Sequence, residues 1–156
     1  MITVEINNKD IDALMKRLSP EERDPKIRAG LLESAQYLVG EVQKGMTTHV
    51  DSGAARSSIV AGLRGHGTDL RGTVGSPLVH VFVMEHGRRP NQKPPPTAPI
   101  KLWLQRHGMD PKLAFVVARS IGRKGSFSGG MHQFENAAKL GLSTVRSIMT
   151  RHLEGL

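Results

Sequence analysis

The sequence predicts a single α+β domain, in which a small antiparallel sheet packs against a long N-terminal helix and helices from the C-terminal part. Apolar residues recur at helical spacing near both ends of the 156-residue chain, and they alternate with polar or small residues in between. Strands grouped between helical blocks are typical of α+β domains and not of alternating α/β domains. A chain of this length is expected to form one domain, residues 1–156.

The longest predicted helix follows a short amphipathic segment, Ile11–Leu18, which ends at Ser19-Pro20. Asp24 is placed to cap the free amides of the next helix, and Pro25 is tolerated at its first position. The apolar stripe of that helix covers about six turns at 3.6 residues per turn. Its members are Ile27, Leu31, Ala35, Leu38, Val42 and Met46.

The middle of the chain predicts a β-hairpin followed by a third strand. Two alternating segments, around Ala61 and around Gly72, are separated by the turn sequence Gly65–Thr68. The next segment, Leu78–Glu85, is apolar almost throughout. We expect it to be a strand buried on both faces, although a short buried helix would give the same pattern.

Two loops and three helices complete the prediction. The proline-rich loop 87–97 is followed by a helix that begins at Thr97 as its cap and ends at Gly108. Asp110-Pro111 repeats the cap-and-proline pattern and opens a helix that reaches Ile121. A loop rich in Gly and Ser spans residues 122–130. The last helix starts near Met131, with an apolar side that we expect to consist of Phe134, Ala138, Leu142, Val145, Ile148 and Met149.

Composition excludes several classes of protein. The chain has no cysteine, which excludes disulfides, thiolate metal sites and cysteine nucleophiles and favours a reducing compartment. No apolar run is long enough to span a bilayer, so we expect no membrane partner. Lys and Arg exceed Asp and Glu by 22 to 14, a formal charge of +8 that permits binding to nucleic acid or to an acidic surface. Because the basic residues occur as short pairs, a solvated surface is the simpler interpretation.

Candidate catalytic and metal-ligating residues are few. His80 and His86 would face the same side of a strand, but two ligands do not make a structural zinc site. Glu85 ends an apolar run, and we expect it to form a structural ion pair with Arg88. No second catalytic group lies at a defined spacing, and no glycine motif matches a phosphate-binding loop. We therefore expect no enzymatic activity, no metal and no cofactor.

The order of several short motifs resembles a known family. These motifs are the turn Asp51-Ser52-Gly53-Ala54-Ala55-Arg56-Ser57-Ser58-Ile59, then Val74-Gly75-Ser76, Glu85-His86-Gly87, Pro94-Pro95-Pro96 before Trp103, Ala114 to Ser126, and Phe134-Glu135-Asn136-Ala137. In this order they resemble the neck and tail-completion proteins of tailed phages, the minor tail protein family of lambdoid siphophages. The resemblance covers residues 25 to 145.

The resemblance implies a structural virion protein without catalysis. Its subunits would form a homo-oligomeric ring at the head-proximal end of the tail, or in the neck, and would contact tail tube or terminator proteins and the head connector. Assembly would take place in the cytoplasm of the host bacterium, and DNA could pass through the lumen. The two loops would then hold the contacts, and the interface candidates are Arg88, Arg89, Pro90, Lys93, Arg123, Lys124 and Phe127.

Two other functions stay open at this point. The charge of +8 is compatible with a basic nucleic-acid-binding accessory protein. A hydrolase or nuclease is supported only by scattered histidines.

Overall fold

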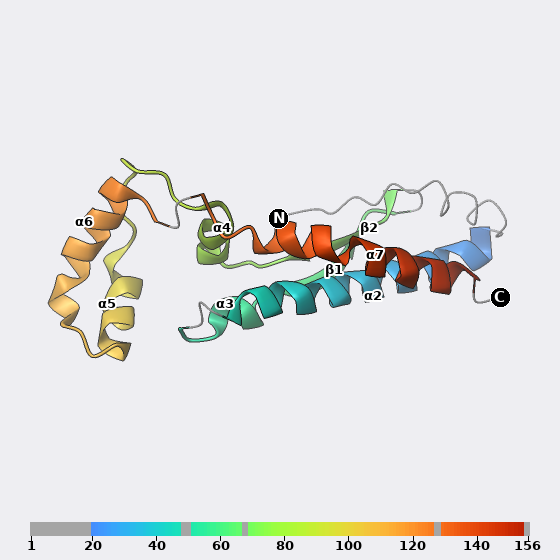
Figure 1. Ribbon diagram of the computed structural model, residues 1–156, viewed down its shortest axis with the longest axis horizontal. Coiled ribbons are helices and arrows are strands. Elements are labelled where there is room, and N and C mark those ends of the chain that lie inside the picture. Colours follow the sequence, from blue (N-terminus) through green and yellow to red (C-terminus); the bar gives the residue numbers. More distant parts are fainter. Residues whose placement is uncertain (1–19, 48–50, 67–68, 127–128, 155–156) are drawn as a thin grey trace. The chain divides into compact units, whose positions relative to one another are not determined.

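The computed structural model describes residues 20–47, 51–66, 69–126 and 129–154, and side chains from residue 24 onward. Its elements, shown in Figure 1, are α2 (Pro20–Gly45), α3 (Ala54–Ser57), β1 (Val60–Arg64), β2 (Arg71–Gly75), α4 (Val79–His86), α5 (Thr97–Arg106), the short 3-10 helix η3 (Pro111–Leu113), α6 (Ala114–Lys124) and α7 (Gln133–Glu154). The predicted α+β class is confirmed. Contacts divide the chain into two compact units: unit 1 comprises residues 1–79 and 133–156, and unit 2 comprises residues 80–132.

Unit 1 is organised by the antiparallel pair α2 and α7, which lie side by side in Figure 1. Glycines allow the two helices to approach closely. A Cβ atom on Gly30 of α2 would lie 2.9 Å from the sulfur of Met149, and one on Gly141 of α7 would lie 2.8 Å from Cδ2 of Leu38. Real Cβ atoms do not approach other atoms this closely, so alanine at either position would require the Met149 or the Leu38 side chain to move.

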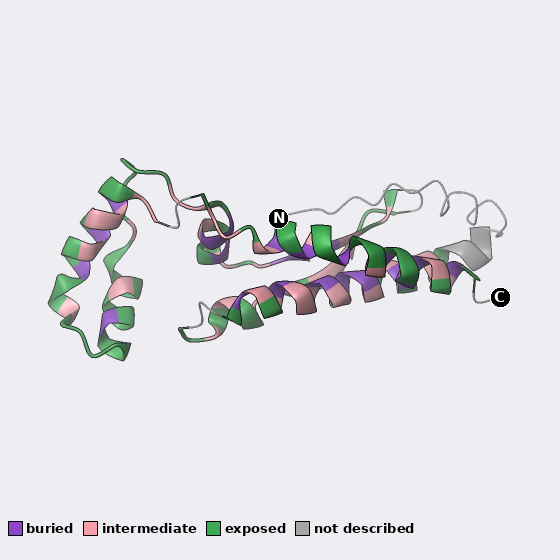
Figure 2. Cartoon of the chain, in the orientation of Figure 1, coloured by how far each residue is buried: buried purple, intermediate pink, exposed green. Residues whose placement is uncertain are grey.

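The predicted stripe of α2 forms much of the core of unit 1. Ala35, Leu38, Val42 and Met46 are all buried, and Figure 2 shows the buried positions along this helix. The stripe of α7 is rotated slightly from the prediction. Buried positions on α7 are Phe134, Ala137, Gly141, Val145, Ile148, Met149 and Leu153, whereas the predicted Leu142 is 41% exposed.

The predicted hairpin is confirmed. Strands β1 and β2 pair antiparallel with Ala61 opposite Val74, and both strands pack against α2. A Cβ on Gly72 would lie 3.0 Å from the carbonyl oxygen of Leu31, so the small residue lets the strand approach the helix backbone. At the base of the hairpin the hydroxyls of Ser58 and Ser76 share a hydrogen bond of 2.7 Å.

The predicted third strand is wrong, because residues 79–86 form α4. In a helix the three buried residues of this segment, Val81, Met84 and Glu85, follow the i, i+3, i+4 spacing of one face. The described residues contain one sheet, and it has two strands. A continuous apolar run of this length fits either a buried strand or a helix. In the structure only one face of the segment is buried, as expected for a helix on the surface of a core.

Two predicted helix starts also differ. Helix α2 begins at Pro20, so Pro25 lies inside it and not at its first position. Proline has no amide hydrogen, so α2 lacks one main-chain hydrogen bond at Pro25. The helix nevertheless continues past it. Thr97 is the first residue of α5 and not its cap; Pro96 occupies the cap position without a side-chain hydrogen bond.

Unit 2 contains a second helix pair, in which α5 packs against η3 and α6. Leu104, 1% exposed, lies at its centre together with the buried Ala114 and Ala118. Gly108 has a φ of 67° after the end of α5, and Asp110 accepts a hydrogen bond of 2.9 Å from the amide of Lys112, as predicted. Helix α6 continues through Lys124, so the loop predicted over 122–130 starts three residues later than expected.

Candidate functional site

The two predicted loops of unit 2 are paired with each other. The amide of Arg88 donates to the carbonyl oxygen of Ser126 at 2.8 Å, and the amide of Ser126 donates back at 3.1 Å. Further along, the amides of Asn91 and Gln92 donate to the carbonyl oxygens of Arg123 (3.2 Å) and Gly122 (2.9 Å). We call residues 88–93 and 122–126 together the paired-loop segment.

This pairing caps the C-terminal end of α6. The last four carbonyl groups of a helix have no partner within the helix. The carbonyl of Ile121 accepts from the amide of Gly125 at 2.9 Å, and those of Gly122 and Arg123 accept from the proline-rich loop. The proline-rich loop is therefore fixed by helix carbonyls that would otherwise need water.

Two glycines make the pairing possible. A Cβ on Gly122 would lie 2.9 Å from the carbonyl oxygen of Gln92 and 3.0 Å from Cγ of Pro94. Gly125 has a φ of 78°, in the left-handed region that other residues rarely adopt, and a Cβ there would overlap the carbonyl of Arg88. The two loop backbones can therefore make contact at Gly122 and Gly125, where any side chain would hold them apart.

The paired-loop segment brings six of the seven predicted interface residues together: Arg88, Arg89, Pro90, Lys93, Arg123 and Lys124. The seventh, Phe127, lies outside the described residues. Arg89, Lys93, Arg123 and Lys124 are exposed, and none forms an ion pair with a described residue. Cations that are dispersed along the sequence thus become neighbours in the fold.

Arg88 differs from the other four cations because it is half-buried. Its Nη2 atom donates to the carbonyl oxygen of Lys93, and its Nε atom is buried without a hydrogen-bond partner. Arg88 therefore links the first and last residues of the stretch 88–93. Glu85 is buried at 3% exposure, and the predicted ion pair between Glu85 and Arg88 stays a prediction.

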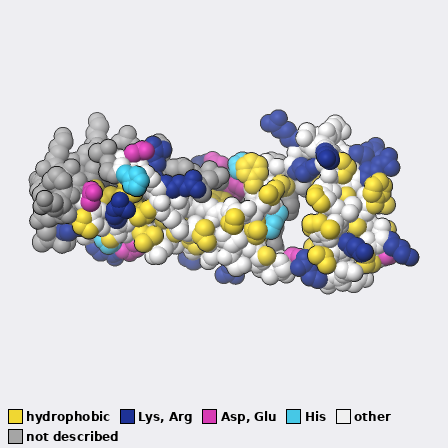
Figure 3. All heavy atoms as spheres, turned by 180° about the vertical axis from the view of Figure 1, so that it is seen from behind, with side chains coloured by type: hydrophobic (Ala, Val, Ile, Leu, Met, Phe, Trp, Pro, Cys, Tyr) yellow, Lys and Arg dark blue, Asp and Glu magenta, His cyan; other side chains and the backbone are white. Residues whose placement is uncertain are grey.

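The net positive charge of the chain lies almost entirely in unit 2. Residues 80–132 contain nine Lys and Arg but only two acidic residues, a net charge of +7, whereas the other residues contain 13 and 12, a net charge of +1. Between residues 86 and 132 the single acidic residue is Asp110. Dark blue Lys and Arg side chains project from this part of the molecule in Figure 3.

The helices of unit 2 also leave large apolar side chains in contact with solvent. On α6, Phe115 is 67% and Val116 62% exposed, and on α5, Leu102 is 60% exposed. Further exposed apolar residues of this unit are Phe82, Trp103, Met109 and Leu113, and Figure 3 shows hydrophobic side chains over this region. Large apolar side chains left exposed in this number are typical of a surface that another molecule covers.

Sequence reasoning missed these apolar residues because it followed the buried stripe of each helix. The missed signal was the apolar run Leu113–Ala118, which places apolar side chains on both faces of α6. Apolar side chains on two faces of a helix need cover on both, and one side of packing leaves the other face exposed.

The histidines of α4 do not form the pair that a strand would have given. His80 and His86 lie on different faces, because six residues are not a whole number of helical turns. The His86 ring lies against that of Phe82, with centroids 4.3 Å apart. Among the described residues, no group of three or more potential ligands could hold a metal ion, and no helix is long and apolar enough to cross a membrane.

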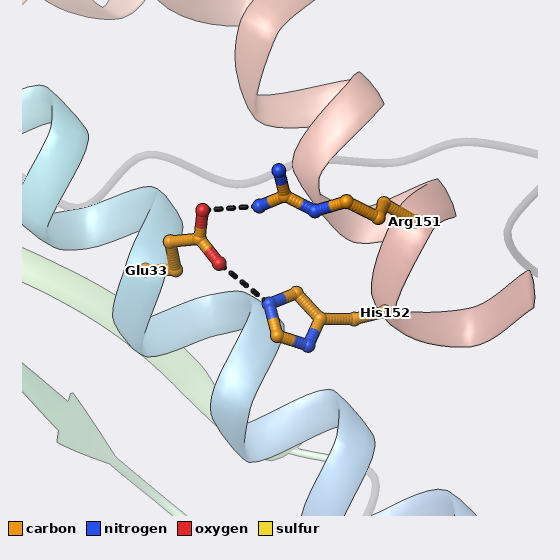
Figure 4. A network of polar contacts seen from close by, with 3 residues as sticks. All are labelled: Glu33, Arg151 and His152. Carbon is orange, nitrogen blue, oxygen red and sulfur yellow. Dashed lines mark hydrogen bonds and ion pairs between the residues drawn. The ribbon is translucent and has the colours of Figure 1, made fainter. Parts of the chain in front are cut away.

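A polar network in unit 1 joins the two long helices (Figure 4). The Glu33 carboxylate of α2 lies 2.6 Å from Nε2 of His152 on α7 and accepts a second hydrogen bond from Arg151. The hydrogen bond from His152, followed by that from Arg151, lowers the pKa of Glu33 below its usual value. All three side chains are at least partly exposed and connect helices, so we interpret the network as structural.

The chain was compared with protein-family models, with curated proteins and with solved structures, and none of them matches it.

Proposed function

We propose that this chain is a structural subunit of a tailed-phage virion, which forms a ring at the head-proximal end of the tail and has no catalytic activity of its own. The order of motifs that resembles the neck and tail-completion family supports the phage assignment. Self-association is supported by the exposed apolar side chains of unit 2.

The observation that carries the proposal is the outer face of α6. Phe115 and Val116 are both more than 60% exposed, and Arg119 and Arg123 follow them at helical spacing on the same face. An apolar centre with a charged border is the usual arrangement of a protein interface. Burial of two large side chains that a free subunit leaves in water would stabilise an assembly.

The charge distribution favours a ring over a two-fold dimer through this face. A two-fold contact brings the same patch of two subunits together, so two units of charge +7 would repel each other. A head-to-tail contact places the face of unit 2 against a different surface of the next subunit. Such contacts form a closed ring when the rotation between subunits closes.

The test is the assembly state of the purified full-length chain. We expect sedimentation velocity to show a single large species, and negative-stain images to show rings. The double variant Phe115→Ser/Val116→Ser should sediment as a monomer with an unchanged far-UV circular dichroism spectrum.

The matched control is Leu140→Ser/Leu142→Ser, which removes two exposed leucines from α7 in unit 1. This control should still assemble. A wild-type chain that stays monomeric at all concentrations and is absent from purified virions would contradict the proposal. Loss of assembly in the control alone would show that the interface lies on α7 and not on α6.

The alternative of a nucleic-acid-binding accessory protein is supported by one observation, the net charge of +7 on unit 2. DNA binding by a chain that never assembles would favour it over the ring.

A further inference from the structure

The paired-loop segment has the chemistry of a polyanion-binding surface. It places Arg89, Lys93, Arg123 and Lys124 on one small region without a described carboxylate to neutralise them. Like charges held together repel each other and lower the stability of the compact state. An arrangement of this kind is compensated by an anionic partner.

The backbone of this surface is fixed before a partner arrives. Four main-chain hydrogen bonds join residues 88–92 to residues 122–126, and Gly122 and Gly125 let the two backbones touch. The half-buried Arg88 closes the loop through the carbonyl of Lys93. A partner would therefore order only the side chains, which lowers the entropy cost of binding.

The residue types of the segment favour phosphate over an acidic protein. Its residues are Arg, Arg, Pro, Asn, Gln and Lys in one loop and Gly, Arg, Lys, Gly and Ser in the other. A stable protein interface needs apolar or aromatic anchors at its centre. The only apolar side chain larger than a hydrogen atom in this set is that of Pro90. Phosphate contacts need only cations and polar donors, which Asn91, Gln92 and Ser126 add to the four cations.

The same residues favour a duplex over a single strand. Binding of single strands relies on aromatic side chains on which bases stack, and neither residues 88–93 nor residues 122–126 include an aromatic residue. We infer that the paired-loop segment binds the phosphate backbone of duplex DNA without reading its sequence. This inference does not depend on ring formation.

The experiment measures binding of the full-length chain to a fluorescein-labelled 30-bp DNA duplex of arbitrary sequence by fluorescence anisotropy over a series of NaCl concentrations. With four phosphate contacts, a plot of the logarithm of the affinity against the logarithm of the salt concentration should have a slope of about −3.6. The affinity should therefore fall about 150-fold between 50 and 200 mM NaCl. A duplex of different sequence should bind equally well.

The test variant replaces Arg89, Lys93, Arg123 and Lys124 with Gln and leaves the structural Arg88 in place. Its affinity should fall by about 10-fold or more, and its salt slope should become flatter by about 3.6. The matched control replaces four exposed arginines of unit 1, Arg28, Arg56, Arg64 and Arg146, with Gln, so that both variants lose the same charge. The control should keep the slope and most of the affinity, and both variants should keep the circular dichroism spectrum of the wild type.

Three outcomes would overturn the inference. The first is the absence of duplex binding at 50 mM NaCl, and the second is an equal loss in both variants, which would assign binding to the total charge. The third is that poly(L-glutamate) of matched total charge, or single-stranded DNA, binds as tightly as the duplex; the partner would then be an acidic protein or a single strand. Assembly is measured by sedimentation without DNA, so failure of the ring and failure of DNA binding can be told apart.

Discussion

The main-chain amide of Gln92 donates a hydrogen bond of 2.9 Å to the carbonyl oxygen of Gly122, and this bond attaches the proline-rich loop to the last turn of α6. Gly122 is buried, and its missing side chain is what allows the contact. The bond connects residues 30 positions apart in the sequence, so the basic surface depends on the integrity of the helix end.

Replacement of Gly122 by alanine should detach the loop. The new Cβ would lie 2.9 Å from the Gln92 oxygen, and overpacking of this kind costs about 1–3 kcal/mol. Alanine gains about 1 kcal/mol of helix propensity, so the net loss of stability should be about 1 kcal/mol. Hydrogen exchange should become faster at the amides of Asn91 and Gln92.

Gly40→Ala is the matched control, because Gly40 lies inside α2 and a Cβ there meets nothing within 4 Å. This variant should be more stable than the wild type by up to about 1 kcal/mol, with unchanged exchange at Asn91 and Gln92. If both alanine variants are stabilised equally, the close contact at Gly122 is not a constraint.

Replacement of Leu104 by alanine should destabilise the helix pair of unit 2. Leu104 is 1% exposed, and removal of a buried leucine side chain costs about 2–5 kcal/mol. We expect amide protection to be lost over residues 97–124 and retained in α2 and α7, whose core is separate. Hydrogen exchange with mass spectrometry measures both regions in one sample.

Leu102→Ala removes the same side chain from a position that is 60% exposed. It should change stability by less than about 0.5 kcal/mol. Simultaneous loss of protection in α2 and α7 of the Leu104 variant would show that the two units unfold together.

Local patterns predicted the long helices and the hairpin. The apolar stripe of α2 has four of its six members buried, and the alternation around Ala61 and Gly72 gave the correct pairing. Leu78–Glu85 could not be assigned by pattern, because a short apolar run has no period that separates a strand from a buried helix. Pro25 predicts a helix start because proline fits best in the first turn, whereas α2 holds it inside the helix at the cost of one main-chain hydrogen bond.

The candidate site was predictable as a set of residues but not as an arrangement. Arg88, Arg89, Lys93, Arg123 and Lys124 are recognisable as basic residues in glycine- and proline-rich sequence. Their proximity depends on main-chain hydrogen bonds between 88–92 and 122–126, and main-chain groups are the same for every residue type except proline. The exposed Phe115 and Val116 look like core residues in the sequence, since exposure is a property of the packing around them.

The network at Glu33 predicts a pH-dependent stability. The pKa of Glu33 is lowered in the folded state by His152 and Arg151, so the folded protein holds this proton less tightly than the unfolded chain. The stabilisation is therefore complete above the unfolded value, near 4.5, and is lost as the pH falls through the lower folded value. The melting temperature of Glu33→Gln should lie below that of the wild type at pH 6, and the difference should shrink as the pH falls below 4.5.

Glu154→Gln serves as the control for this series, because Glu154 is an exposed carboxylate on α7 outside the network. It should give a smaller difference in melting temperature at pH 6 than Glu33→Gln. A difference between Glu33→Gln and the wild type that is constant from pH 6 to pH 3 would exclude the ionised carboxylate as the cause.

Replacement of Ser34 by alanine should stabilise the protein. Ser34 lies in α2 and is 4% exposed, and its Oγ atom is buried without a hydrogen-bond partner. A buried hydroxyl without a partner costs about 1 kcal/mol or more, so its removal should raise the free energy of unfolding by about 1 kcal/mol in urea denaturation.

Ser58→Ala is the control, because the Ser58 hydroxyl contacts the carbonyl of Ala55 and the hydroxyl of Ser76, each at 2.7 Å. This control should lose about 1 kcal/mol. A loss of stability in the Ser34 variant would mean that its hydroxyl has a partner in solution, such as a bound water.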